Sequence, residues 1–152
     1  MSDFQITQKE ADELLKEEKY RTDDTKYTFP EKGGVLHIPL TTKNHGANFT
    51  LDVRRGNIEL KKNTFQTRVR KEIVLARLDL GGPPHCNPDE EEVPCPHLHL
   101  YREGFGDRWA YPLSGHFTNP ADIWLTLEEF MDYCNIIEKP DIRGDRLYEP
   151  KK

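Results

Sequence analysis

At 152 residues the chain has the length of about one domain, and a domain of this size buries roughly 68–70% of its unfolded surface. Leu, Ile, Val and Phe make up 35 of the 152 residues, above the level of roughly 20% that is typical of disorder, and no stretch approaches the roughly 18 apolar residues of a membrane-spanning helix. Residues 1–10 lack the apolar core of a secretory signal, and three cysteines do not suggest a disulfide framework, so we expect a cytoplasmic protein without a membrane partner.

The N-terminal half predicts one helix followed by short strands. Residues 7–10, Thr-Gln-Lys-Glu, have the form of a capping box, and apolar residues follow at helical spacing, so we expect a helix over residues 8–20. Residues 35–40 are β-like. Residues 49–53 and 58–60 alternate between apolar and polar side chains, and the turn-forming residues between them predict a hairpin.

The C-terminal half adds longer strands and a second helix. Residues 64–80 predict one long bent strand or two, and the Gly-Gly-Pro-Pro segment at 81–84 ends it. Residues 97–102 and 107–111 predict a second hairpin, preceded by an acidic loop over residues 87–96. Thr126 to Glu129 has the form of another capping box, and an apolar stripe then predicts a helix; the stripe comprises Leu127, Phe130, Met131 and Cys134.

These elements predict an α+β fold. We expect an N-terminal helix, an antiparallel meander of about five strands and a C-terminal helix, with both helices on one face of the sheet. Residues 1–139 form the single predicted domain, and residues 140–152 form a polar C-terminal tail.

Charge is segregated along the chain. Residues 54–77 contain eight basic and two acidic side chains, a local charge of +6, so the remaining residues sum to −11. Such a basic band is commonly a solvated sheet face, but a polyanion site has the same composition. The residues that we assign to nucleic-acid binding are Arg54, Arg55, Arg68, Arg70, Lys71 and Arg102.

The basic side chains of segment 68–77 cannot all line one groove if the segment is a straight strand. Strict alternation would send Arg68 and Arg70 to one face and Lys71 and Arg77 to the other. We therefore predict an irregularity between Arg70 and Ile73 that leaves Arg68, Arg70 and Arg77 on the same side as the histidines.

The pair His97 and His99 is the main candidate for a catalytic site. On a strand these side chains and Tyr101 share one face, with the imidazoles roughly 6–7 Å apart. That separation suits either two ligands of one metal ion or an acid and a base around a phosphate. If the preceding strand pairs beside them, Arg77 could hold an anion and Asp79 could orient an imidazole. The predicted catalytic residues are His97, His99, Tyr101 and Arg77.

Metal-ligand residue types also cluster here. His85, Cys86, Cys95, His97 and His99 fall within 15 positions, and all are zinc-ligand types. The cysteines lack the paired C-x2-C spacing of a zinc ribbon or finger, so we predict no metal ligands and no cofactor. The sequence also lacks a phosphate-binding glycine loop of the Walker type and a G-x-S-x-G nucleophile elbow.

The segment PHLHLYREGFGDRWAYP, residues 96–112, resembles a bacterial family of about this length that is known as a domain of unknown function. The resemblance extends over most of the chain, including residues 51–52, 75–79 and 130–135, and implies no activity. The order of elements is also similar to that of small ribonuclease toxins of toxin–antitoxin pairs. That similarity implies metal-independent RNA cleavage, for which His97, His99, Arg77 and Tyr101 would supply base, acid and cation.

The leading hypothesis is a nucleic-acid-directed protein of a mobile or defence-type locus, specifically a small metal-independent ribonuclease whose partner is RNA or another polyanion. The alternative is a non-enzymatic interaction module of inhibitor or anti-defence type, whose partner is a protein such as an antitoxin or a defence component. A third interpretation is a metal-binding protein that uses the histidine and cysteine cluster. Histidines that converge in a groove with Arg77 would favour an enzyme, and histidines dispersed or packed in the core would favour a module.

Overall fold

The computed structural model of the protein describes residues 5–57 and 62–144. Within these residues the two helices are α1 (Gln8–Lys16) and α2 (Ile123–Tyr133). The twelve strands of the same residues are β1 (Lys19–Arg21), β2 (Lys26–Thr28), β3 (Val35–Thr41), β4 (Asn48–Arg55), β5 (Asn63–Val69), β6 (Ile73–Leu80), β7 (His85–Cys86), β8 (Glu92–Val93), β9 (His97–Leu100), β10 (Ala110–Pro112), β11 (Ile136–Glu138) and β12 (Asp141–Arg143).

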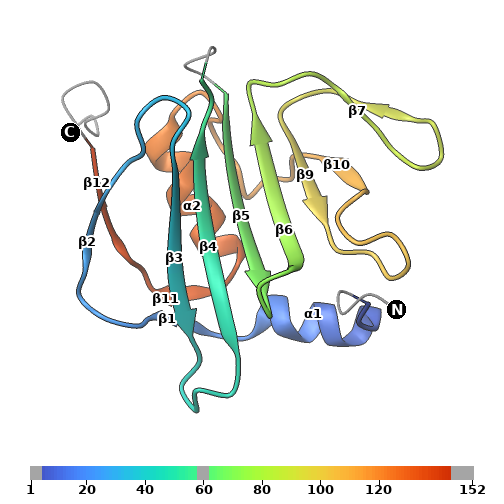
Figure 1. The fold of residues 1–152 in the computed structure, drawn as a ribbon. Coiled ribbons are helices and arrows are strands. Elements are labelled where there is room, and N and C mark those ends of the chain that lie inside the picture. Colours follow the sequence, from blue (N-terminus) through green and yellow to red (C-terminus); the bar gives the residue numbers. More distant parts are fainter. Residues whose placement is uncertain (1–4, 58–61, 145–152) are drawn as a thin grey trace.

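Eight of these strands form one mixed sheet, in the order β10-β9-β6-β5-β4-β3-β1-β11 (Figure 1). Its neighbouring strands are antiparallel except for the parallel pair β1 and β11. The predicted α+β meander of about five strands is therefore wrong, because the protein is mostly β and its main sheet is larger and mixed. The outer strands β1, β10 and β11 have three residues each, too few to produce a detectable period-two pattern.

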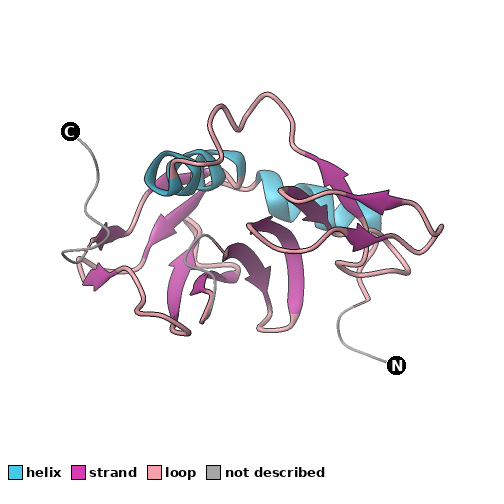
Figure 2. Ribbon diagram, turned by 90° about the horizontal axis from the view of Figure 1, so that it is seen from above, coloured by secondary structure: helices cyan, strands magenta, loops and turns pink. Residues whose placement is uncertain are grey.

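The sheet has one apolar and one polar face. Alternate residues of β4, β5 and β6 are buried beneath α2, where the rings of Phe65 and Phe130 lie 6.2 Å apart. Both helices lie on this side, which we call the core face (Figure 2). The opposite side, which we call the polar face, carries His37, Asp52, Arg54, Thr64, Gln66, Arg68, Arg77, Asp79, His97 and His99.

The ends of the helices differ from the predicted ones. The capping box at Thr7 and Glu10 is confirmed, but α1 ends at Lys16 and not near Tyr20. Helix α2 begins four residues before the predicted start, because Asp122 and not Thr126 is its N-cap: the Asp122 side chain accepts a hydrogen bond from the Leu125 amide. The capping box predicted at Thr126 is wrong, since its buried hydroxyl lies inside the helix and donates to the Asp122 carbonyl. Neither helix of the described residues is long and apolar enough to cross a bilayer.

The second predicted hairpin is present with altered limits, and in place of the first the structure pairs β4 with β5. Strand β4 continues to Arg55, which pairs with Asn63 at the start of β5; the predicted strand over residues 58–60 lies outside the described residues. Residues 64–80 form two strands, and β9 pairs with β10 as the second hairpin predicts. The predicted tail begins with β12, which pairs with β2, while residues 145–152 lie outside the described residues.

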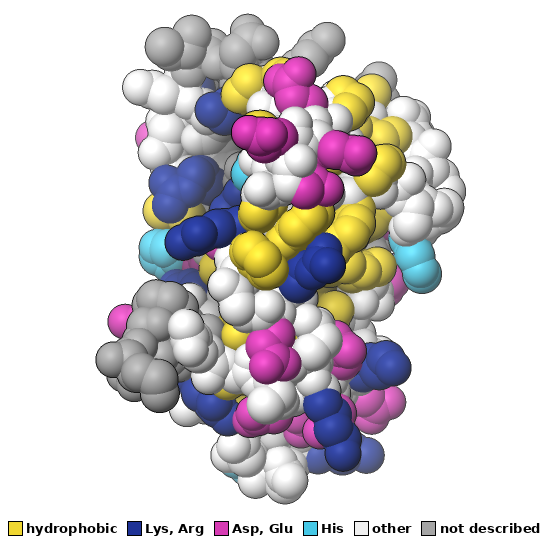
Figure 3. Space-filling model, turned by 90° about the vertical axis from the view of Figure 1, so that its right-hand side faces the viewer, with side chains coloured by type: hydrophobic (Ala, Val, Ile, Leu, Met, Phe, Trp, Pro, Cys, Tyr) yellow, Lys and Arg dark blue, Asp and Glu magenta, His cyan; other side chains and the backbone are white. Residues whose placement is uncertain are grey.

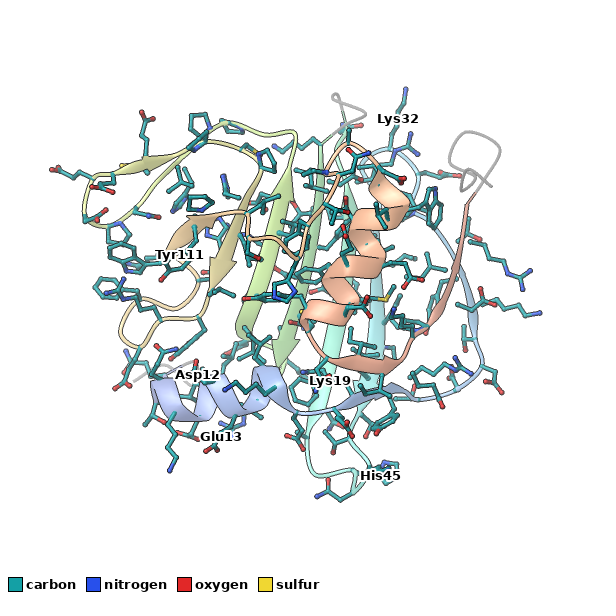
Figure 4. The ribbon with its side chains drawn as sticks, turned by 180° about the vertical axis from the view of Figure 1, so that it is seen from behind. Asp12, Glu13, Lys19, Lys32, His45 and Tyr111 are labelled. Atoms are coloured by element: carbon teal, nitrogen blue, oxygen red, sulfur yellow. The ribbon has the colours of Figure 1, made fainter. Side chains whose placement is uncertain are left out.

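Lys19 joins the C-terminal ends of the two helices on the core side (Figure 4). Its fully buried ammonium donates to the carbonyl oxygens of Leu15 and Glu17 at 2.9 Å and of Cys134 at 2.7 Å. Carbonyls at a helix C-terminus have no partner within the helix, so one lysine satisfies acceptors of both helices. Its Nζ also lies 4.8 Å from the centre of the Phe49 ring. Burial lowers the pKa of Lys19 to about 8, so the ammonium stays charged at neutral pH.

Replacement of Lys19 by methionine should destabilise the fold. Methionine fills a similar volume but leaves three carbonyl oxygens without their donor, and we expect a loss of about 3 kcal/mol in the free energy of unfolding. Urea denaturation of Lys19→Met measures this loss, with Lys16→Met in the exposed last turn of α1 as the control. Equal stability of the two variants would show that the three hydrogen bonds contribute little.

Candidate functional site

The pairing of β6 with β9 assembles a polar cluster. Arg77 lies opposite His99 and Asp79 lies opposite His97, which is the strand pairing that the sequence predicted. All four side chains belong to the polar face, whereas Leu78 and the other intervening residues face the core. His97 is 2% exposed and His99 is 0% exposed, so the two imidazoles lie within the protein, whereas Arg77 and Asp79 are partly exposed.

Each histidine ring is oriented by a backbone carbonyl. His99 Nδ1 lies 2.8 Å from the Asp107 carbonyl oxygen, and His97 Nδ1 lies 3.3 Å from that of Pro94. A carbonyl oxygen only accepts hydrogen bonds, so both Nδ1 atoms carry the proton. In the neutral form each ring therefore has its lone pair on Nε2.

Both Nε2 atoms lie beside one oxygen of Asp79. Asp79 Oδ2 is 3.2 Å from His97 Nε2 and 3.1 Å from His99 Nε2. The other oxygen, Oδ1, accepts a hydrogen bond from the Thr64 hydroxyl at 3.3 Å and lies 3.4 Å from Arg77 Nε. These partners orient the carboxylate so that Oδ2 faces the two imidazoles.

Asp79 is ionised at neutral pH. Burial alone would raise the pKa of Asp79, but the contact with His99 and the positive charge of Arg77 outweigh burial and lower the pKa to about 2. The contact with His99 lowers this pKa when a proton lies between Nε2 and Oδ2, and a metal cation in place of that proton would stabilise the same carboxylate.

Arg77 lies at the border of the cluster, where two hydrogen bonds hold its guanidinium group. Its Nη1 donates to Asp107 Oδ2 at 2.7 Å, and its Nη2 donates to His99 Nε2 at 3.1 Å. The hydrogen bond to His99 requires an unprotonated Nε2, which agrees with the neutral Nδ1–H form of that ring.

A groove of about 480 Å³ opens beside the cluster on the polar face. His97, Asp79 and Arg77 line it, so His97 and the carboxylate border a solvent-accessible space, whereas His99 lies beneath them. His85 also lines the groove, and its ring centre lies 4.5 Å from that of His99. Its Nε2 donates to the Arg108 carbonyl oxygen at 2.7 Å. The other lining residues are Asp52, Arg54, Lys62, Thr64, Gln66, Leu80, Gly82, Pro83 and Pro84.

Cys86 and Cys95, two of the zinc-ligand residue types noted in the sequence, lie apart from the Nε2 atoms of His97 and His99 and from Asp79 Oδ2. Asp79, His97 and His99 are the group in the described chain whose ligand atoms all lie within 4.8 Å of one another. Cys95 Sγ donates to the Asp79 carbonyl oxygen at 3.3 Å, and Cys86 is exposed. The sequence analysis predicted no metal ligands because of the cysteine spacing, and it did not consider Asp79 as a ligand beside the two histidines.

Tyr101 lies away from the histidines. The chain leaves β9 after Leu100, and the Tyr101 hydroxyl donates to the Ile6 carbonyl oxygen at 2.8 Å and accepts from the Ile6 amide at 2.9 Å. Strict alternation from His97 onward placed Tyr101 on the same face, but the strand is too short for that extrapolation.

The predicted nucleic-acid-binding residues do not form one surface. Of the six, Arg54 lines the groove. Arg55 is buried, with Nη1 3.3 Å from the Pro30 carbonyl oxygen, and Arg102 stacks on the Trp109 ring at 4.1 Å. Arg70 and Lys71 are exposed in the loop that joins β5 to β6.

The predicted strand irregularity occurs at a different place. Arg70 and Lys71 have φ angles of 53° and 70° and form the hairpin loop, whereas the register shift lies between Thr67 and Arg68. The shift leaves Arg68 and Arg77 on the polar face, but Arg70 lies in the loop and not beside the histidines.

A second polar cluster surrounds Asp52, in the same row of the sheet as Arg77 and His99. Asp52 Oδ2 accepts hydrogen bonds from Arg68 Nε and Gln66 Nε2, each at 2.7 Å, and Oδ1 lies 2.6 Å from His37 Nδ1. Arg68, assigned above to nucleic-acid binding, is therefore held by a buried carboxylate.

The sequence analysis did not identify three residues of the site. Thr64 positions Asp79, Asp107 holds Arg77, and Lys62 lines the groove. Thr64 could have been found because it precedes Gln66 and Arg68 at alternate positions of β5. Asp107 belongs to a loop, where no periodicity indicates the direction of a side chain.

The chain belongs to the family described as "Family of unknown function (DUF6978)", whose model matches residues 6–136. Comparison with curated proteins finds no match, and comparison with solved structures finds none. The resemblance to an uncharacterised family is thus confirmed at that level, and the similarity to ribonuclease toxins has no support in these comparisons.

Replacement of Asp52 by asparagine should change the sensitivity to acid. Burial alone would raise the pKa of Asp52, but hydrogen bonds from Arg68, His37 and Gln66 outweigh it and keep the pKa below 3.8. A carboxyl group with a lower pKa in the folded state contributes stability that is complete above about pH 4 and is lost as the pH falls through the folded value. Asp52→Asn should therefore be less stable at pH 7 and lose less stability below pH 4.

Urea unfolding at a series of pH values from 7 down to about 2.5 measures this dependence. Glu91→Gln, which changes an exposed carboxyl of the acidic loop, serves as the control. Parallel acid profiles for Asp52→Asn and the wild-type protein would assign the acid sensitivity to other carboxylates.

Proposed function

We propose that the protein binds one divalent transition-metal ion through Asp79, His97 and His99, and that this ion is zinc in a site of the open, catalytic type. The observation that carries the proposal is the convergence of two Nε2 atoms on one carboxylate oxygen at 3.1 and 3.2 Å. Of the three interpretations of the sequence, this is the metal-binding one, with Asp79 in place of the cysteines.

The distances suit a metal ion. Zinc binds imidazole nitrogen and carboxylate oxygen at about 2.0–2.2 Å, so two ligand atoms of a tetrahedral site lie roughly 3.3–3.5 Å apart. The two nitrogen-to-oxygen separations are slightly shorter than this, and the three ligand atoms all lie within 4.8 Å of one another, so the side chains would move on binding the ion.

The protonation states also suit a metal ion. Ligating histidines commonly donate their other ring N–H to a carbonyl oxygen, as both histidines do here, and this fixes the lone pair on the ligating nitrogen. A ligating carboxylate must be ionised, and the Arg77 guanidinium, whose Nε lies 3.4 Å from Asp79 Oδ1, favours that form.

Three protein ligands leave a coordination position for water. Zinc bound in this way lowers the pKa of its water to about 7, which is the chemistry of zinc hydrolases. The groove beside Asp79 and His97 would admit a substrate to that position. Arg77 would give up its hydrogen bond to His99 Nε2 on metal binding and remain held by Asp107.

The ribonuclease hypothesis fits this geometry less well in its metal-independent form. An acid and a base would act from opposite sides of a phosphate, whereas the two Nε2 atoms lie beside the same oxygen. The full burial of His99 also favours a ligand role over direct contact with a substrate.

Metal titration tests the proposal. Chelator-treated wild-type protein should bind about one equivalent of Zn²⁺, and zinc should raise its melting temperature, because a ligand of the folded state stabilises that state. Asp79→Asn, which preserves shape, and His97→Gln should each weaken zinc binding by about 100-fold or more. Isothermal titration and metal analysis by mass spectrometry provide the readouts.

His116→Gln is the matched control, because His116 is exposed and its ring packs on Tyr133, away from the site. This variant should bind zinc as the wild-type protein does. Wild-type protein that binds zinc no better than folded Asp79→Asn would overturn the proposal, and purification with stoichiometric iron would replace zinc as the resident ion.

A further inference from the structure

Two cations of the groove lack an ion-pair partner among residues 5–57 and 62–144. Arg77 and Arg68 are both engaged by carboxylates, through Asp107 and Asp52. The side chains of Arg54 and Lys62 also border the groove, but no hydrogen bond or ion pair within the described chain engages them. Unpaired basic groups on a groove wall form an anion-binding surface.

The strand register places Arg54 in line with the metal-ligand cluster. Arg54 lies opposite Thr64, Thr64 opposite Asp79, and Asp79 opposite His97, so these residues form one row across the polar face. Neighbouring strands are about 4.8 Å apart, which separates the backbones of Arg54 and Asp79 by roughly 10 Å. Arg54 and Asp79 both line the groove, and an arginine side chain is long enough to contact an anion held between them.

Lys62 approaches the same space from the end of the groove. A side-chain carbon built on Gly82 would lie 3.8 Å from Lys62 Cε, so the lysine stem packs beside that glycine. Gly82, Pro83 and Pro84 form the groove wall that follows β6. Lys62 therefore lies along this wall of the groove.

We infer that the groove binds a phosphate ester whose phosphoryl oxygens lie between the metal position at Asp79 and the side chains of Arg54 and Lys62. The inference rests on the proposed function for the ion at one end of the phosphate. Arg54, Lys62 and Arg77 contribute three positive charges to the groove lining, against the two negative charges of Asp52 and Asp79. A bound divalent ion would raise the local excess from +1 to +3.

Phosphate matches this lining better than a carboxylate does. A phosphoryl group has three terminal oxygens, so it can contact a metal ion, a guanidinium fork and an ammonium at once. The Lys62 ammonium would contact one phosphoryl oxygen as a point charge, and the planar Arg54 guanidinium would donate two hydrogen bonds to the others. Figure 3 shows several Lys and Arg side chains along its upper left border, and others at its centre and lower right.

Calorimetric titration of the zinc-loaded protein with adenosine 5′-monophosphate tests the inference. Arg54→Gln/Lys62→Gln should bind this ligand at least about tenfold more weakly, with unchanged zinc stoichiometry, because neither residue is a metal ligand. Lys9→Gln/Lys26→Gln removes the same charge at exposed positions outside the groove and should bind as the wild-type protein does. The same titrations without metal separate the contribution of the cations from that of the ion.

The outcomes distinguish this inference from the proposed function. Zinc binding without phosphate binding, equal weakening by both double variants, or equally tight binding of succinate would overturn the phosphate assignment and leave the metal site standing. Phosphate binding that depends on Arg54 and Lys62 in a protein that binds no metal would support the groove and overturn the metal site. Among supporting results, tighter and steeply salt-dependent binding of a single-stranded RNA hexamer would indicate a nucleic-acid source, and equal affinity would indicate a small phosphate ester.

Discussion

The antiparallel pairing of β6 with β9 holds two imidazoles and one carboxylate together inside the protein, and the polar face is arranged around that contact. His97 and His99 are two residues apart on one strand, and Asp79 enters from the next. The backbone carbonyls of Pro94 and Asp107 determine which nitrogen of each ring is protonated. Removal of any of these elements would leave buried polar atoms without partners, which costs about 1–3 kcal/mol each.

Apolar packing on the core face offsets the free-energy cost of the polar clusters in a small protein. Helix α2 covers β4, β5 and β6 with apolar side chains, so the opposite side of the same strands can carry two clusters of buried charge. Lys19 joins α1 to α2 at one end of this layer, through three carbonyl oxygens. Each strand thus contributes alternately to stability and to the site, and a one-residue slip in register would exchange the two sets of side chains.

The local pattern predicted the elements that have their own periodicity or caps. The capping box of α1, the long strands and the second hairpin follow from neighbouring residues, as does the placement of Asp79 and Arg77 beside the histidines. The short strands β1, β11 and β12 could not be predicted, because long-range parallel pairing defines them. The meander of about five strands was wrong for that reason.

The candidate site was predictable in its centre and not at its margins. Alternation on β9 located His97 and His99, but it failed for Tyr101, where the strand ends. Charge counting identified a basic band, but it could not show that Arg55 is buried on the core face. It also could not show that Asp52 holds Arg68, whereas Arg54 lines the groove with no ion-pair partner among the described residues. Contacts between side chains of neighbouring strands determine which basic residues are held by carboxylates. These contacts join residues far apart in the sequence, so no single segment predicts them.

X-ray absorption spectroscopy of the zinc-loaded protein tests the metal centre most directly, because it reports the atoms bound to the ion. A site made by Asp79, His97 and His99 predicts nitrogen and oxygen neighbours at about 2.0–2.2 Å, with the outer-shell scattering of two imidazoles. A sulfur neighbour at about 2.3 Å would assign the ion to Cys86 or Cys95, and a spectrum of hydrated zinc would show that these three side chains bind no metal.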